Sequence, residues 1–213
     1  MIETRSEYTL DALDERTRQL VRTAAIISSG DETILRETLA IAARSVPVEW
    51  MEELIVQSYL FSGFPRALNA AREWRRVSPV AAPLVDEGDD VTHVDEWRAR
   101  GEVTCAAVYG GMYDKLRVNI RHLHPALDAA MVVEGYGKIL GRPGLDLPRR
   151  ELCIVAACAS TGQDRQLHSH LHGSLNVGVA PKALADAVDA LLPVIGADRV
   201  RAVRLLLARV VGK

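Results

Sequence analysis

The sequence is poor in cysteine and in aromatic residues. Its 213 residues include 3 cysteines, and aromatic side chains make up 5% of the chain. Cys105, Cys153 and Cys158 are an odd set without a CxxC pair, which argues against a disulfide framework and for a reducing compartment. The N-terminus lacks a basic start followed by an apolar run, so we expect no signal peptide and a cytoplasmic location.

The chain also lacks a long hydrophobic run and a strong excess of one charge. No stretch approaches the roughly 18 apolar residues of a membrane span, so we expect no membrane contact. The formal net charge is −2. The densest basic cluster, Arg72, Arg75 and Arg76 with Arg66 upstream, is interpreted as a solvated helix face rather than a phosphate site. We therefore expect no nucleic-acid partner.

Helix-forming residues dominate what is present. Ala, Leu and Arg are abundant, and they favour helices. Apolar positions recur at three- and four-residue steps, a spacing typical of helices, in the stretches 10–27, 32–44, 48–60, 66–76, 112–123, 125–140, 148–160, 164–176, 182–192 and 197–211, and the same spacing resumes near Val94. Ser45 is expected to cap the third helix, and Asp146 to cap the helix that begins near Pro148. No segment shows strand alternation, so the predicted fold is all-α.

The two ends of the chain follow the same plan. Counted from Gln19 and from Glu151, an apolar helix reaches a glycine break at the same distance, Gly30 and Gly162, and a proline follows the next helix in both. Because this plan is also common in unrelated helical proteins, the pattern alone leaves a duplication open.

A linker candidate separates the two ends. Residues 77–92 combine two prolines and a glycine with an acidic run, and such a composition buries little apolar area. The expected division is a first repeat at 1–76, a linker at 77–110 and a second repeat at 111–213.

Three runs in the last third carry more than periodicity: 136–146 (YGKILGRPGLD), 150–152 (REL) and 166–178 (QLHSHLHGSLNVG). They read as an acidic residue opening an apolar helix, a glycine break, a histidine in the next helix, and then Gly-small-Leu-Asn-x-Gly. This pattern resembles the signature of the carboxymuconolactone decarboxylase family. Residues 48–65 are similar to that family's acidic helix, which ends in Tyr-x-x-Gly-x-Pro.

The resemblance implies an alkylhydroperoxidase D-like helical bundle with a duplicated unit. Each copy is degenerate where the other is intact, since Thr38 stands at the place of His170, and Gln19 at the place of Glu151. Relatives with one copy are typically hexamers and duplicated relatives are trimers, so we expect a homo-oligomer, most simply a trimer.

The resemblance also implies a lyase that acts without a cofactor on a small-molecule substrate, a carboxylated lactone or organic acid. His170 is the expected proton donor and Glu151 its tuning partner, because histidine titrates near neutrality and passes protons readily. Arg142 is either a fork for a substrate carboxylate or a surface turn arginine. Tyr136 either lines the pocket or only packs.

One site per chain is expected, centred on His170. The helix that bears Gln57 and Tyr59 is expected to close it, either from the same chain or from a neighbour.

Two further functions compete with the lyase. A non-catalytic scaffold or small-molecule-binding protein would keep the fold with an inert His170. A thiol peroxidase of the alkylhydroperoxidase D branch is disfavoured, because Gln163 and Gln166 stand at the places of its two cysteines. No metal is expected: His168 and His172 are one turn apart, but a third ligand is missing.

Overall fold

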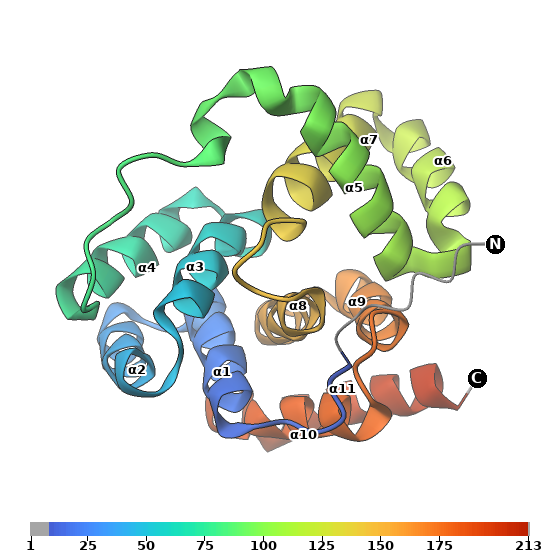
Figure 1. Ribbon diagram of the computed structural model, residues 1–213. Helices are drawn as coiled ribbons and strands as arrows, with labels where there is room; N and C mark the ends of the chain where they lie inside the picture. Colours follow the sequence, from blue (N-terminus) through green and yellow to red (C-terminus); the bar gives the residue numbers. More distant parts are fainter. Residues whose placement is uncertain (1–8, 213) are drawn as a thin grey trace.

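The computed structural model describes residues 9–212, which form a bundle of helices (Figure 1). In chain order the helices are α1 (Glu15–Ser29), α2 (Glu32–Ser45), α3 (Val48–Ser62), α4 (Phe64–Val77), η1 (Glu87–Asp89), η2 (Val91–His93), α5 (Val94–Tyr109), η3 (Gly110–Met112), α6 (Tyr113–Leu123), α7 (Pro125–Ala130), η4 (Met131–Leu140), α8 (Leu147–Thr161), α9 (Asp164–Asn176), α10 (Pro181–Ala190) and α11 (Leu192–Val211). The described residues contain an isolated β-bridge between Leu10 and Val179 but no named strand, so the predicted all-α fold is confirmed.

Two findings concern the membrane and the N-terminus. Within residues 9–212 no helix is long and apolar enough to cross a bilayer. The N-terminal residues 1–8, on which the expectation about a signal peptide rests, lie outside the described part of the chain.

Aspartates cap the N-termini of three of the α-helices. The side chains of Asp14, Asp31 and Asp146 each accept a hydrogen bond from the backbone N–H three residues later. The cap predicted at Asp146 is therefore confirmed. The cap predicted at Ser45 is wrong, because Ser45 still belongs to α2 and its hydroxyl donates to the carbonyl of Ile41, 3.2 Å away.

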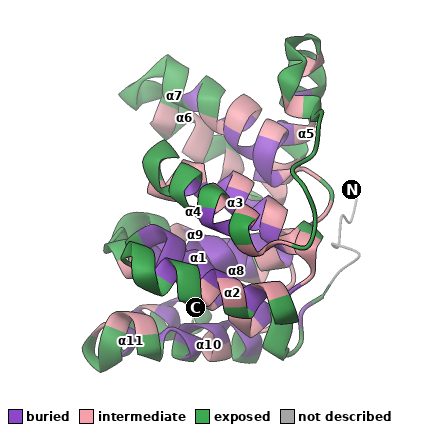
Figure 2. Cartoon of the chain, turned by 90° about the vertical axis from the view of Figure 1, so that its left-hand side faces the viewer, coloured by how far each residue is buried: buried purple, intermediate pink, exposed green. Residues whose placement is uncertain are grey.

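The core lies around α1, α8 and α9. Every residue of α8 from Arg150 to Ala159 is buried, so this helix is enclosed on all sides. Figure 2 shows α1, α8 and α9 in a middle layer, of which α1 and α8 are largely buried, with α10 and α11 on one side and α3 and α5–α7 on the other. Helix α8 therefore holds its side chains away from water, and α9 does so along the face that carries Leu167, His170 and Leu171.

The segment between the two ends is shorter than expected. Residues 94–109 of the expected linker 77–110 form α5, which buries Trp97, Gly101, Cys105 and Val108 along one face. The proline-rich and acidic composition ends before α5 begins, and the apolar residues that follow recur at helical steps.

The stretch 125–140 is not the single helix that was predicted. It divides into α7 and the π-helix η4, whose hydrogen bonds reach one residue further than those of an α-helix. Helix α5 crosses η4 at two glycines. A Cβ at Gly137 would lie 1.9 Å from the carbonyl oxygen of Trp97, and one at Gly101 would lie 2.0 Å from that of Val132.

The order of the helices repeats along the chain. Helices α1, α2 and α3 begin at residues 15, 32 and 48, and α8, α9 and α10 begin at 147, 164 and 181. The spacings agree to within one residue, and α1 packs directly against α8.

We predict that Gly137→Ala destabilises the protein by about 1–3 kcal/mol, the usual cost of overpacking. The gain of about 1 kcal/mol in helix propensity cannot offset a methyl group placed against a backbone carbonyl. Urea denaturation followed by circular dichroism measures the difference. Gly111→Ala is the matched control, because nothing lies within 4 Å of a Cβ there. Equal stability of the two variants would contradict the close crossing.

Candidate active site

Helices α8 and α9 bring Glu151 and His170 into direct contact. The Nδ1 atom of His170 lies 2.8 Å from Oε2 of Glu151. The histidine is 4% exposed and the glutamate 0%. A carboxylate here accepts the Nδ1–H, which orients the ring and leaves Nε2 as the nitrogen available for chemistry. The contact expected between these two residues is present in the structure.

A glycine makes room for this contact. A Cβ at Gly173 would lie 2.7 Å from Oε2 of Glu151 and 2.7 Å from a methyl carbon of Val108. The carboxylate therefore approaches the backbone of α9 where a side chain would otherwise stand. The second oxygen, Oε1 of Glu151, is buried and has no hydrogen-bond partner among the described residues. An unpaired buried acceptor is costly, so this oxygen is a strained polar atom directly behind His170.

A hollow of about 340 Å³ opens beside His170. Its walls come from α3, α5, α7, η4 and α9, and they are mostly apolar: Leu60, Phe61, Tyr109, Leu127, Ala130, Met131, Glu134, Gly135, Tyr136, Leu140 and His170. Phe61 meets the His170 ring edge-on at 5.6 Å between centroids. The rings of Tyr109 and Tyr136 meet in the same way at 5.9 Å. His170 thus faces a small, largely apolar chamber.

The π-helix decides which residues reach this chamber. Met131, the stretch 134–136 and Leu140 line it, and Met131, Tyr136 and Leu140 follow one another at steps of five and four residues. In a helix with i to i+5 hydrogen bonds, residues that are four to five positions apart lie on the same face. In an α-helix, residues 131 and 140 would stand about half a turn apart and could not share a wall. Tyr136 therefore lines the pocket, as one of the two sequence interpretations held.

Both tyrosines of the chamber remain neutral. Burial raises the pKa of Tyr109 and of Tyr136 above the usual value, and the negative charge of Glu151 raises both further. Their hydroxyls are therefore hydrogen-bond donors throughout the range in which proteins are stable.

Tyr59 lies next to the chamber rather than in its wall. Its hydroxyl donates to Oε1 of Glu134 at 2.5 Å, and its ring stacks on Phe64 at 4.7 Å between centroids. Burial and the bond to Glu134 raise the pKa of Tyr59. Helix α3 does close the site from within the same chain, through Leu60 and Phe61. Sequence reasoning missed Phe61 and Glu134, and the only available signal was the nearness of Phe61 to Tyr59.

The structure does not bring Gln57 or Arg142 to this chamber. Gln57 is buried against Arg150, whose Nη1 donates to its Oε1 at 3.0 Å. The guanidinium of Arg142 is held by Glu53 at 3.1 Å and by Asp86 at 2.7 Å. Neither residue lines this chamber, and each pairs with a charged or buried polar group of the fold.

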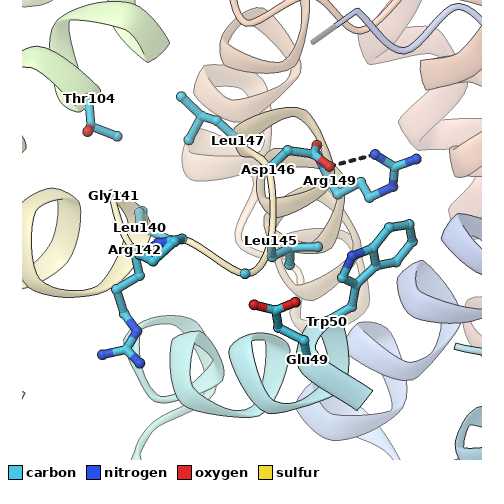
Figure 3. Close-up of a pocket in the computed structure, with 12 residues that line it drawn as sticks. Glu49, Trp50, Thr104, Leu140, Gly141, Arg142, Leu145, Asp146, Leu147 and Arg149 are labelled. Atoms are coloured by element: carbon cyan, nitrogen blue, oxygen red, sulfur yellow. Dashed lines mark hydrogen bonds and ion pairs between the residues drawn. The ribbon is translucent and has the colours of Figure 1, made fainter. Parts of the chain in front are cut away.

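A second, larger hollow of about 640 Å³ surrounds the turn before α8. Figure 3 shows Trp50, Asp146 and Arg149 at one end of it and Arg142 at the other. Arg149 stacks over the Trp50 ring at 4.3 Å and pairs with Asp146 at 2.5 Å. Neither Glu151 nor His170 lines this hollow. The chamber beside His170 is therefore the candidate active site, because it contains the acid–base histidine, although the other hollow is larger.

The remaining histidines of α9 lie apart from the chamber walls. His168 and His172 meet edge to face at 4.9 Å between ring centroids. Across residues 9–212, no group of three or more His, Cys, Asp or Glu side chains is arranged to hold a metal ion.

The thiols are buried and protonated. Cys105, Cys153 and Cys158 are 0%, 1% and 2% exposed. Burial, followed by the charge of Glu151, raises the pKa of Cys158 to about 12. Burial likewise raises the pKa of Cys105 to about 12. A peroxidatic cysteine needs the opposite, an accessible thiolate.

We predict that the native protein does not reduce peroxide. At pH 8 a thiol with a pKa near 12 is ionised to about one part in ten thousand, so the attacking thiolate is almost absent. Hydrogen peroxide consumption with dithiothreitol as donor measures this, and a thiol reagent should label all three cysteines only after unfolding in guanidinium. Peroxide turnover that is lost in Cys158→Ser or Cys105→Ser would overturn the prediction.

We also predict that Glu53→Gln lowers the free energy of unfolding by about 3–5 kcal/mol, the usual cost of breaking a buried ion pair. Glu53 contacts the fully buried Arg150 at 2.7 Å, so the substitution leaves that charge without its carboxylate. Chemical denaturation gives the value. Asp186→Asn, which removes an exposed pair with Lys182, is the control and should change stability within experimental error. A loss no greater than the control's would contradict the prediction.

Comparisons with known proteins bear on the same residues. A search of curated proteins finds no match. A comparison with models of protein families matches residues 125–209, which run from α7 into α11 and include Tyr136, Glu151 and His170. The match agrees with the resemblance found in residues 136–178. This part of the chain is thus similar to the carboxymuconolactone decarboxylase family.

Proposed function

We propose that this protein is a lyase-like enzyme in which His170 delivers a proton to a carbon atom of a small carboxylated lactone or organic acid. The observation that carries the proposal is the buried contact of 2.8 Å between His170 and Glu151 at the wall of an apolar chamber. A histidine oriented by a carboxylate is a recurrent general acid–base device. The family match over residues 125–209 supports the same type of reaction.

The step requires one proton and no redox partner. The bond between the substrate carbon and its carboxylate breaks, carbon dioxide leaves, and a conjugated carbonyl of the substrate delocalises the electron pair. The proton on Nε2 of His170 then forms the new C–H bond, and the imidazole regains a proton from solvent. Glu151 stabilises the cationic ring before the transfer. Such general acid catalysis contributes about 10²–10⁴-fold.

The chamber walls assist this chemistry. They contain no lysine or arginine, and most of the lining side chains are apolar. A carboxylate there is poorly solvated, whereas the neutral carbon dioxide that leaves is not penalised. The hydroxyls of Tyr109 and Tyr136 hydrogen-bond to each other, so the neutral Tyr109 hydroxyl is the donor left for the substrate carbonyl, where negative charge develops.

A small-molecule-binding protein without catalysis is the second candidate. The apolar lining favours it, because a chamber of this kind binds a ligand of suitable shape without any proton transfer. Under this alternative His170 is one wall residue among several.

Two finer inferences accompany the proposed function. The repeated helix spacing, together with the packing of α1 on α8, supports two related copies of one unit in the chain. Exposed apolar side chains on α2 and α4, namely Ile41, Phe64 and Leu68, support assembly into an oligomer, which we propose is a trimer.

We predict that His170→Gln lowers carbon dioxide release from carboxymuconolactone at least 100-fold while the circular dichroism spectrum stays unchanged. Glutamine retains a polar side chain of similar size but cannot deliver the proton. His168→Gln on the same helix is the matched control and should retain activity. Equal rates in the two variants would remove the catalytic role of His170. Tight binding of the lactone without turnover in the wild type would favour the binding protein instead.

A further inference from the structure

The chamber contains a carboxylate that the proposed reaction does not use. Glu134 lies on η4, lines the chamber and is partly buried. Its Oε1 accepts the 2.5 Å hydrogen bond from Tyr59. Within residues 9–212 no hydrogen bond or ion pair reaches its other oxygen, Oε2. A half-satisfied carboxylate at an apolar wall attracts a hydrogen-bond donor or a cation.

The basic side chains of the surrounding elements are occupied elsewhere. Lys138, on the same helix, lies over the Trp97 ring at 4.8 Å. Arg117 and Arg121 on α6 both pair with Asp128. Among residues 9–212, no lysine or arginine lines the chamber, and its ionisable wall residues apart from the tyrosines are Glu134 and His170. The charge of Glu134 is thus not neutralised by the protein.

Glu134 is also held in place. Tyr59 fixes one of its oxygens, and the stacking of Tyr59 on Phe64 limits the movement of the tyrosine ring. The backbone of η4 is anchored in turn, because Nε of Arg100 donates to the carbonyl oxygen of Gly137 at 2.6 Å. A fixed acceptor recognises a ligand donor with little entropic cost, as binding sites require.

We propose that Glu134 is a ligand-recognition residue that accepts a hydrogen bond from a hydroxyl or ammonium group of the bound molecule. The chamber then selects ligands with an apolar body and a donor group at one end, and it rejects a carboxylate at that end by charge repulsion. This inference adds a substrate class to the proposed function. It rests on that function only where it places the reacting carbon beside His170. The preferred substrate is accordingly an acid or lactone that also carries a hydroxyl or an ammonium group, and carboxymuconolactone, which has a second carboxylate instead, is expected to be a weakly bound test substrate.

Three probes of the same shape test this recognition: cyclohexylmethylamine, cyclohexylmethanol and cyclohexanecarboxylate. Isothermal titration calorimetry at pH 7 gives the Kd of each with the full-length protein. We expect the amine to bind at least tenfold more tightly than the carboxylate, with the alcohol between them. Glu134→Gln should remove the advantage of the amine while its amide oxygen still accepts from Tyr59.

Glu102→Gln is the matched control, because it removes the same charge from an exposed position on α5. It should leave the three affinities unchanged, which separates local recognition from the overall charge of the protein. Tyr59→Phe should weaken amine binding less than Glu134→Gln does, because it loosens the carboxylate without removing it.

Several outcomes would overturn the proposal. They are a carboxylate probe that binds as tightly as the amine, equal effects of Glu102→Gln and Glu134→Gln, and no binding of any probe at millimolar concentration. The probes have no reacting carbon, so the result does not depend on catalysis. Loss of the lyase function with the expected probe ranking would remove the proposed reaction and leave the role of Glu134 standing.

Discussion

The guanidinium of Arg150 is enclosed by protein on every side, and its hydrogen bonds connect three parts of the chain. It donates to the backbone oxygen of Leu145 at 2.9 Å, to Gln57 at 3.0 Å and to Glu53 at 2.7 Å. A buried cation is tolerated only when its donors are satisfied in this way. The network ties α3 and the turn before α8 to the first turn of α8 itself. Glu151 is the next residue, so the position of the site depends on this charge.

Close backbone contacts at three glycines also position the residues of the site. Gly101 and Gly137 let α5 and η4 approach until a Cβ would collide with a carbonyl group, and Gly173 admits the carboxylate of Glu151 beside α9. These glycines give up helix propensity, by about 1 kcal/mol each relative to alanine. The close packing that these glycines allow forms a chamber with walls from several helices. It also shields the acid–base pair of Glu151 and His170 from water.

The sequence predicted the helices well because their apolar spacing, aspartate caps and glycine breaks are local signals. The pairing of Glu151 with His170 followed from a resemblance and was found at 2.8 Å. The ion pairs of Arg142 were not predicted, because its partners Glu53 and Asp86 lie 89 and 56 residues away in the sequence, where no local pattern reveals them. Gln57 and Arg150 lie 93 residues apart in the sequence, so no local pattern predicted their contact.

The π-helix was invisible for a different reason. It draws on the same residue types as an α-helix, and only the tertiary contacts of η4 with α5 decide between the two. Nothing in the sequence singles out Glu134 as a residue of the chamber. Its partner Tyr59 lies 75 residues earlier in the chain, and only the fold brings the two together.

The π-helix also gives the chamber an unusual sensitivity to chain length. The wall formed by Met131, Tyr136 and Leu140 depends on how many residues separate them as well as on which residues they are. Deleting one residue from this stretch would favour α-helical winding and turn one end of the wall by roughly 100° relative to the other. Point substitutions reshape the chamber gradually, whereas a one-residue insertion or deletion exchanges an entire wall. Relatives of different length in this segment are therefore expected to accept different ligands even where Glu151 and His170 have not changed.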